Sequence, residues 1–357
     1  MLVLELLKWA AAEAPSARAE RIASMLAEGR DRELRWVMDA GLGPMLYFAV
    51  RDHIERVPAA WRDVLLSADL TAQVRHAAVI DTANQVIDAC TELGIPVTLL
   101  KGISISDQYY PAGHLRPMGD IDILVPSEAC DAVESALLRI GYRPDATHPR
   151  NGDMHHSPPL LEPERKVWVE LHTSLFPRYE ELSKANLFHS SQVAMRSAIS
   201  SFQGKSARRL TDELQLAYIA CSWMRDLTLS GVQPCFLASL FDAVYLLKAS
   251  AIRLDWNKLL SSLDDDTAAA SLYVTLGFVS RHRLCTVPRE TFSFLRANQR
   301  LVGRLQIRAI HAMLDNCLVG GRYWTLPMPP PVPGRYNLRN QLHKRWLDRL
   351  PISRRPT

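Results

Sequence analysis

Three short β-rich runs lie within an otherwise helical chain, and they restrict the fold more than any other feature. The runs are residues 95–100, 119–125 and 167–172. A helix is expected from Lys101 to Tyr110 after the first run, and Ser127 is placed to cap a second helix that ends at Gly141. Strand, helix, strand, helix and strand within about eighty residues predict a small α/β sheet unit.

The segments on either side of these runs have helical patterns. From residue 70 to 93 apolar residues recur with a period near 3.6 until Gly94, and Thr211 is placed to cap a long apolar helix. A proline-rich stretch at 327–333 then breaks regular structure. These changes predict four parts: a helical N-terminal region at 1–92, an α/β core at 93–205, a helical C-terminal domain at 206–320, and a proline-rich, basic tail at 321–357.

The composition is typical of a folded globular protein. Of 357 residues, 48% are apolar and 22% charged, and no run of about 18 residues is free of charge, so no transmembrane segment is expected. The N-terminus lacks the pattern of a secretion signal. The six cysteines lie far apart without a CxxC pair, which argues against a zinc framework and favours a reducing compartment. A cytoplasmic location is therefore expected.

The charge is concentrated at one end of the chain. The net charge is +4, but residues 335–357 hold seven basic side chains and one acid, which gives the tail +6 and leaves −2 for the rest. A near-neutral body does not suggest a broad nucleic-acid surface. Nucleic acid could bind through the tail but is not the favoured partner. Within the tail, four apolar residues have the spacing of an amphipathic helix: Leu342, Trp346, Leu347 and Leu350.

Carboxylates are placed to converge on the expected sheet. Side chains alternate along a strand, so Asp120 and Asp122 share one face of the second run, and Glu170 lies on one face of the third. If the two strands are neighbours, the three groups repel one another unless a cation compensates, and oxygen ligands favour Mg²⁺ or Mn²⁺. A solvated strand face would also explain an Asp-x-Asp pair. The apolar surroundings and the Glu in a second strand favour the metal site.

Two further segments have features of phosphate binding. Lys101-Gly102 directly follows a strand and precedes an expected helix, so backbone N–H groups and an ammonium could meet a phosphate chain there. Ser104 could add a hydroxyl, and Arg116, just before the carboxylate strand, could hold a phosphate. The alternatives are a surface lysine beside a turn glycine, and an arginine that caps its loop.

These segments together resemble a known family. Leu99-Leu-Lys-Gly102, Arg116-Pro-Met-Gly-Asp-Ile-Asp122 and Val169-Glu-Leu-His172 are similar to the LKG, RPxGDxDxL and ElH motifs of a poorly characterised bacterial nucleotidyltransferase family in the DNA polymerase β-like nucleotidyltransferase superfamily. The resemblance covers most of residues 30–270 and includes Leu254-Asp-Trp256 and the helix of Asp242. Better-known members have Gly-Ser or Gly-Gly in the first turn, where this chain has Lys101-Gly102.

The resemblance implies an α+β fold. A small mixed, partly antiparallel nucleotidyltransferase-type sheet would be flanked by helices, with helical N- and C-terminal domains, and residues 93–205 would form the catalytic core. It also points to histidines on either side of the third carboxylate. His156 and His172 are candidates for substrate binding or for a general base, whereas a loop position explains His155 equally well.

The implied activity is transfer of a nucleoside monophosphate from ATP or another nucleoside triphosphate, with release of pyrophosphate. Asp120 and Asp122 would bind two metal ions, and Glu170 would bind the ion that activates the acceptor. Lys101 would contact phosphates. The acceptor is unidentified, and a small molecule is favoured.

Two other functions remain open at this point. One is a toxin-like or regulatory enzyme that nucleotidylates a protein or a tRNA, which the basic tail favours. The other is a non-catalytic nucleotide-binding module that retains the fold, against which the intact carboxylate trio argues.

Overall fold

The computed structural model describes residues 1–147, 155–178, 180–229 and 236–320. The proline-rich stretch, the basic tail with its expected amphipathic helix, residues 148–154 and Cys235 lie outside the described residues. The helices are α1 (Leu2–Ala11), α2 (Ser16–Ala27), α3 (Asp31–Asp39), α4 (Gly43–Val50), α5 (Ala59–Glu92), α6 (Lys101–Tyr109), α7 (Cys130–Arg139), α8 (Ser190–Met195), α9 (Asp212–Leu229), α10 (Phe236–Ala249), α11 (Trp256–Ser261), α12 (Asp266–Arg281), α13 (Arg289–Ala297) and α14 (Arg304–Gly320).

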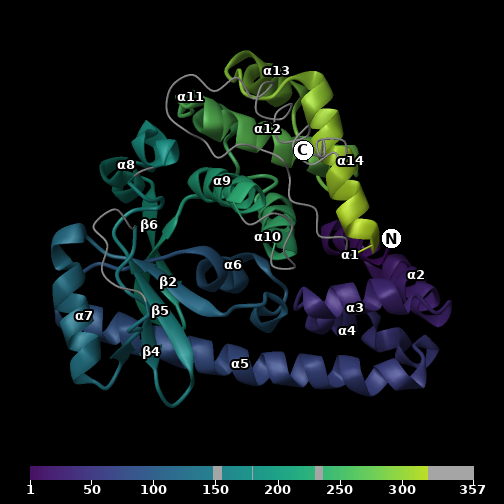
Figure 1. The fold of residues 1–357 in the computed structure, drawn as a ribbon, viewed down its shortest axis with the longest axis horizontal. Helices are drawn as coiled ribbons and strands as arrows, with labels where there is room; N and C mark the ends of the chain where they lie inside the picture. The colour runs from purple at the N-terminus through teal and green to yellow at the C-terminus, as the bar shows by residue number, and fades with distance from the viewer. Residues whose placement is uncertain (148–154, 179, 230–235, 321–357) are drawn as a thin grey trace, which may run out of the picture.

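A mixed sheet lies among these helices (Figure 1). Its strands are β1 (Thr98–Leu99), β2 (Asp120–Leu124), β3 (Arg143–Pro144), β4 (Leu160–Glu162), β5 (Val167–His172), β6 (Ser197–Phe202) and β7 (Lys205–Leu210). The strand order is β3-β4-β5-β2-β1-β7-β6. The pairs β2–β5 and β1–β7 are parallel and the other pairs are antiparallel. The expected α+β fold with a mixed, partly antiparallel sheet is therefore confirmed.

Side chains alternate along the central strands, so the sheet has one apolar face and one polar face. Ile121 and Ile123 of β2 and Val169 of β5 are buried in one cluster with apolar residues of α5 and α7. The opposite face of β2 is covered by α6, and it holds the carboxylates. Burying the aliphatic side of β2 and β5 fixes which way their acidic side chains point.

Three local expectations differ from the structure. The first run forms a strand only at 98–99. Ser127 does not cap a helix, because residues 127–129 form a 3-10 turn, α7 begins at Cys130, and the Ser127 hydroxyl bonds to Glu128. Residues 59–92 form one helix of 34 residues, which begins well before the helical pattern expected at 70–93. Neither proline nor glycine occurs between Pro58 and Gly94, so nothing interrupts it.

The N-terminal and C-terminal helices share one core. Apolar residues of α1 lie in the same buried cluster as those of α9, α10, α12 and α14. Figure 1 shows α1 beside α14 and α10, with α5 running beneath the sheet and the N-terminal helices. The packing closes α9 and α10 over the polar side of β2, where α6 also lies.

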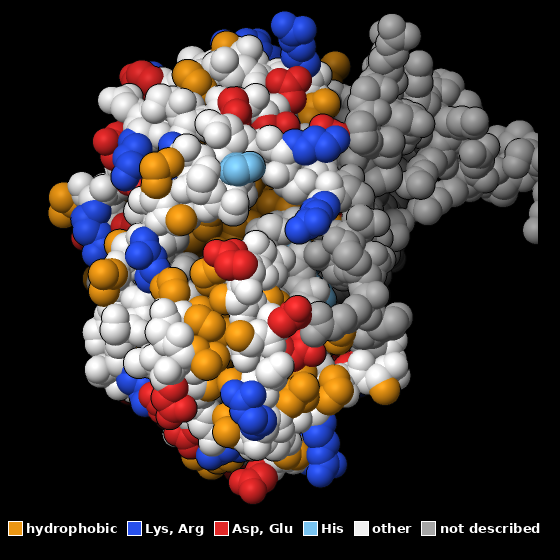
Figure 2. Space-filling model, turned by 90° about the vertical axis from the view of Figure 1, so that its left-hand side faces the viewer, with side chains coloured by type: hydrophobic (Ala, Val, Ile, Leu, Met, Phe, Trp, Pro, Cys, Tyr) orange, Lys and Arg blue, Asp and Glu red, His pale blue; other side chains and the backbone are white. Residues whose placement is uncertain are grey.

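The described surface is mixed in charge on the face shown in Figure 2. Lysine and arginine side chains are interspersed there with aspartate and glutamate, and apolar side chains lie between them. None of the helices in the described ranges is long and apolar enough to cross a membrane.

Candidate functional site

The two carboxylate strands are neighbours, and their register brings two of the acids together. β2 and β5 run parallel, with Asp122 paired with Glu170 and Asp120 paired with Trp168. Asp122 is 3% exposed, whereas Asp120 at the start of β2 is accessible from the cavity, although the protein around it still desolvates its carboxylate. Because β5 follows the same alternation as β2, Glu170 and His172 project to the same face as Asp122.

Lys101 enters this cluster from the turn between β1 and α6. Its backbone has φ = 43°, in the left-handed region that a non-glycine residue rarely adopts. The Leu100 N–H donates to the Asp122 carbonyl at 3.0 Å, which ties the turn to β2. The Lys101 Nζ then lies 2.5 Å from Asp122 Oδ1. The turn thus presents an ammonium to the carboxylate strand.

Three histidines surround the Asp122–Glu170 pair. His172 Nε2 lies 2.8 Å from Asp122 Oδ1 and 3.4 Å from Glu170 Oε2. An ionised carboxylate only accepts, so His172 Nε2 carries the proton that it donates to Asp122. His156 forms a bridge pair with His172 in the backbone, and its Nε2 is 4.0 Å from Glu170. The His155 ring packs against the other two, with centroids at 4.7 and 4.9 Å.

The charges in the cluster are strongly coupled. Burial alone would raise the pKa of Asp122, but the Lys101 ammonium and the His172 hydrogen bond outweigh it and hold that pKa well below its usual range. Burial, followed by the charges of Asp122 and Glu170, raises the pKa of Asp120 to about 6. The carboxylates of the cluster therefore carry more negative charge than the cationic groups beside them compensate.

One group of side chains in the described ranges has the spacing of metal ligands. The ligand atoms of Asp122, Glu170 and His172 all lie within 4.8 Å of one another. Asp120 lies beside this group at the start of β2 and is not a member of it. Carboxylates with one imidazole suit a hard or borderline divalent cation.

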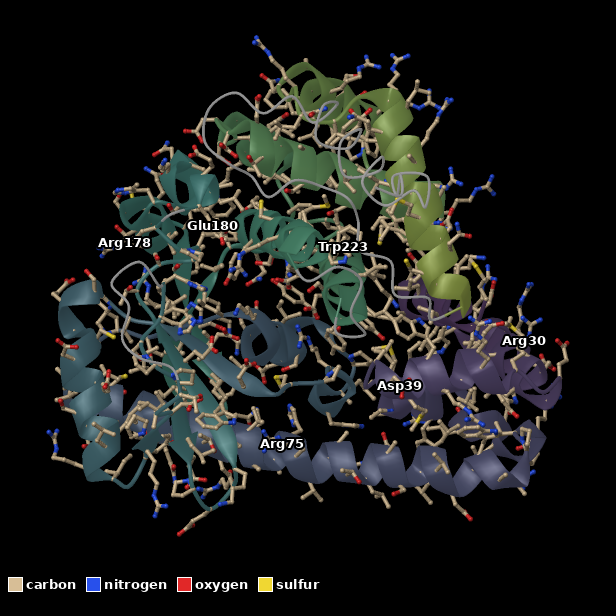
Figure 3. The ribbon with its side chains drawn as sticks, viewed as in Figure 1. Arg30, Asp39, Arg75, Arg178, Glu180 and Trp223 are labelled. Atoms are coloured by element: carbon tan, nitrogen blue, oxygen red, sulfur yellow. The ribbon has the colours of Figure 1, made fainter. Side chains whose placement is uncertain are left out.

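A cavity of about 600 Å³ opens onto this cluster. Its walls come from the end of α3, where Asp39 is labelled in Figure 3, from α6, from the loop before β2, and from α9 and α10. Asp120, Asp122, Lys101 and Gly102 line it on the sheet side. This volume is in the range of small-molecule sites.

Arg116 lies on the cavity wall in a fixed position. Its guanidinium donates to both carboxylate oxygens of Asp242 on α10, at 2.8 to 3.3 Å, and to the Pro117 carbonyl. The Tyr110 hydroxyl donates to the same carboxylate at 2.7 Å. The pair joins the loop before β2 to the C-terminal helices.

Gly102 and Ser104, the other two residues expected to bind phosphate, differ in whether they line the cavity. Gly102 lines the cavity, and a Cβ there would lie 2.8 Å from Met118 and 3.2 Å from Arg116, so a side chain at this position would displace Met118. Ser104 is fully buried inside α6, where its hydroxyl accepts a hydrogen bond from Gln108 at 3.0 Å, and it does not line the cavity.

Several residues of the site have no motif that would have identified them. Gln215, Tyr218, Ser222 and Arg225 line the cavity from one face of α9. Glu180, beside α9 in Figure 3, accepts from Arg225 at 2.8 Å. Helical periodicity predicts that these four α9 residues share a face, but only the packing of α9 over β2 shows that this face meets the carboxylates.

Comparison with solved structures gives a distant likeness. The chain is similar to the solution structure of the antibiotic-resistance factor ANT(2'')-Ia, a study of substrate-regulated conformation dynamics. The identity is 14%, the match covers 57% of this chain and 97% of that chain, and the TM-score is 0.35. A TM-score this low supports no conclusion about this chain. No curated protein matches the sequence.

The match to a protein family covers a larger part of the chain. The sequence profile of a family described as "Uncharacterised nucleotidyltransferase" matches residues 27–282. The matched range is more than half of the chain and contains the Lys101 turn, both carboxylate strands and the α9 and α10 walls. The resemblance expected from the three motifs is confirmed. The chain belongs to this uncharacterised nucleotidyltransferase family.

Proposed function

We propose that the protein is a metal-dependent nucleotidyltransferase that transfers a nucleoside monophosphate from a nucleoside triphosphate to a small acceptor. The observation that supports this is the register of β2 and β5, which puts Asp122 opposite Glu170, with Lys101 in contact, on the wall of a cavity. In the reaction an acceptor oxygen forms a bond to the α-phosphorus. The bond from that phosphorus to the bridging oxygen breaks, and pyrophosphate leaves.

The donor set fits a divalent cation. The raised pKa of Asp120 reflects its burial and two neighbouring carboxylates, which is the repulsion that a cation relieves. We propose that Asp120, Asp122 and Glu170 hold Mg²⁺ or Mn²⁺, with His172 in contact with two of them. When bound, the metal would neutralise charge on the entering and leaving oxygens.

The protein's own groups have distinct tasks in this proposal. Lys101 binds the phosphate chain with its ammonium, and Gly102 lines the cavity beside it. His172 keeps its Nε2 proton on Asp122 and so orients the carboxylates. His156 supports Glu170 from the other side. Arg116 keeps the loop before β2 in place through Asp242.

The cavity supports a small acceptor. A space of about 600 Å³ is in the range of small-molecule sites, and the described side chains form no basic surface on the face shown in Figure 2. Four of the cysteines in the described ranges are buried (Cys90, Cys130, Cys221 and Cys317), and no disulfide joins cysteines within these ranges, which supports the cytoplasm as the compartment.

The test is transfer of label from α-³²P nucleoside triphosphates. The purified full chain is incubated with Mg²⁺ or Mn²⁺, each of the four triphosphates and a metabolite extract, and pyrophosphate release is followed. We expect release that requires the metal, together with a labelled small molecule. Asp122→Asn should abolish both.

Asp88 offers a matched control. It pairs with Lys205 on the exposed side of α5, so Asp88→Asn removes an Asp–Lys pair away from the cavity. Asp88→Asn should retain full activity. Equal pyrophosphate release by wild type and Asp122→Asn, or release without a divalent ion, would contradict the proposal.

A further inference from the structure

Gln215 lines the cavity, and its buried side-chain amide has no partner in the described part of the chain. The side chain is 1% exposed and lines the cavity from the first turns of α9. Neither its Nε2 nor its Oε1 has a hydrogen-bond partner in the described part of the chain. Buried polar atoms are nearly always paired, and leaving them unpaired destabilises the fold. An amide with both ends open therefore marks a place where a ligand completes the hydrogen bonds.

A second glutamine in the same protein shows the ordinary arrangement. Gln299 is 6% exposed, and its Nε2 donates to the Val302 carbonyl at 2.7 Å while its Oε1 accepts from the Val302 N–H at 2.8 Å. Both ends of that amide are paired within the fold. Gln215 has the same burial and the same chemistry but faces the cavity.

The unpaired amide of Gln215 has the hydrogen-bonding groups needed to recognise a nucleobase. A glutamine side chain presents one donor and one acceptor in a plane, which matches the adjacent donor and acceptor on a nucleobase edge. The cavity wall also includes apolar side chains, namely Ile105 and Ile219 on the helices and Met118 on the loop before β2. A planar ring with a polar edge fits such walls.

Position along α9 places this amide beside the phosphate end of the site. Tyr218 lies one helical turn after Gln215 on the same face and shares the cavity wall with Lys101 and Asp122. A triphosphate held at Lys101 would occupy the cavity that Gln215 also lines.

We propose that Gln215 binds the nucleobase edge of the nucleoside triphosphate and sets the base preference of the enzyme. The inference rests on the proposed function, because it takes the cavity to hold a nucleotide. It adds the residue that selects among nucleotides, which no motif in the sequence identifies.

The test is calorimetry on the full chain with Mn²⁺. The probes are the α,β-methylene analogues of the four nucleoside triphosphates and tripolyphosphate, which has no base. We expect wild type to prefer one base and Gln215→Leu to bind that analogue about tenfold more weakly, as for the loss of a bidentate base contact. Affinity for tripolyphosphate should stay the same. The Tm of Gln215→Leu without ligand should equal or exceed that of wild type.

Gln299→Leu is the matched control. It removes a paired amide outside the cavity, so its Tm should fall while its nucleotide affinities and base preference stay those of wild type. Gln215→Met gives the same readout with an unbranched side chain where the leucine variant does not fold.

Three results would overturn the assignment: equal binding of all four analogues by wild type, an unchanged preference in Gln215→Leu and Gln215→Met, or an equal loss of tripolyphosphate affinity. In each of these the wild-type protein still binds nucleotide, so the proposed function stands. Failure of wild type to bind any analogue or tripolyphosphate with Mn²⁺ overturns both.

Discussion

Lys101 reaches Asp122 from a left-handed backbone conformation. Its Nζ lies 2.5 Å from Asp122 Oδ1, and its φ is 43°. The left-handed conformation costs an L-residue about 1–2 kcal/mol, and that cost is carried at the point where a strand turns directly into a helix. The backbone of the turn is therefore strained at the residue whose ammonium is fixed against the carboxylates. Such strain is typical of a functional site.

The first prediction compares two substitutions at this turn. Lys101→Gly and Lys101→Ala both remove the ammonium, so both should weaken tripolyphosphate binding at least about tenfold. Only glycine relieves the left-handed conformation, so Lys101→Gly should be more stable than Lys101→Ala by about 1 kcal/mol in urea unfolding. Equal stabilities would show that the turn is not strained, and full phosphate affinity in both would remove Lys101 from the site.

The second prediction concerns which side chain, Asp120 or His172, is the third metal ligand beside Asp122 and Glu170. We expect Asp120→Asn to weaken Mn²⁺ binding at least about tenfold, because a carboxylate is a far better ligand than an amide for a hard cation. His172→Asn keeps all three carboxylates and should lose less affinity. Mn²⁺ binding is measured by electron paramagnetic resonance, with Asp88→Asn as the unaffected control. A larger loss in His172→Asn would assign the metal to Asp122, Glu170 and His172 instead.

The third prediction is that Arg75 positions both carboxylate strands. Arg75 points from α5 toward the sheet in Figure 3, and its guanidinium donates to the carbonyls of Gly119, Arg165 and Lys166 at 2.8 to 3.2 Å. Gly119 precedes β2 and Lys166 precedes β5. Arg75→Met should destabilise the fold by about 1–3 kcal/mol and also weaken metal binding.

Arg62 provides the control for Arg75. It too donates to two backbone carbonyls, those of Glu55 and Val57, but at the far end of α5 from the sheet. Arg62→Met should lower stability by a similar amount with metal and nucleotide binding intact. If Arg75→Met loses only stability, the residue has no role in placing the acids.

The fourth prediction concerns the pair of Arg116 and Asp242. Asp242 is buried and Arg116 is partly buried, and Tyr110 adds a fourth hydrogen bond to the three that Arg116 makes with Asp242. Asp242→Asn should cost about 3–5 kcal/mol, because it leaves a largely desolvated guanidinium without its countercharge. Arg116→Met combined with Asp242→Leu should cost less than the two single changes together. Strict additivity in urea unfolding would show that the groups do not depend on one another.

The local part of the site could be predicted from the sequence. A period of two puts Ile121 and Ile123 on one face of β2 and Asp122 on the other, and the same rule places Glu170 on β5. Burial of the aliphatic side then leaves one orientation for the acids. The motif segments lie within one sheet unit, so short-range rules suffice for them.

Other parts depend on contacts that no local pattern encodes. The sequence does not predict β7, because Arg208 and Arg209 do not fit the apolar pattern expected of a central strand. Arg209 is nevertheless buried, since its guanidinium pairs with Asp107 at 2.5 Å. The partner of Arg116 lies 126 residues away on α10. Such pairs appear only once the helices pack on the sheet.

The last prediction concerns His311 on α14, far from the sheet. Its ring packs on Phe278 of α12, with centroids 5.8 Å apart, and its Nε2 donates to the Val274 carbonyl at 3.0 Å. Burial lowers its pKa below the usual 6.5, although the carbonyl and Asp315 oppose the shift while Arg281 and His282 add to it. The folded protein therefore keeps His311 neutral.

A histidine with a lowered folded pKa stabilises the protein above pH 6.5 and loses that contribution as the pH falls, because only the unfolded chain takes up the proton. As the pH falls below about 6.5 and toward the lowered folded pKa, the unfolding free energy should fall by up to about 1.4 kcal/mol per pH unit for this one group. His311→Gln should be less stable at pH 7.5 but fall less steeply with acid, since it has no proton to gain. His155, whose pKa burial lowers to about 2, adds the same trend in both proteins. Urea unfolding at a series of pH values gives the two slopes, and parallel curves would mean that His311 is not held neutral by the fold.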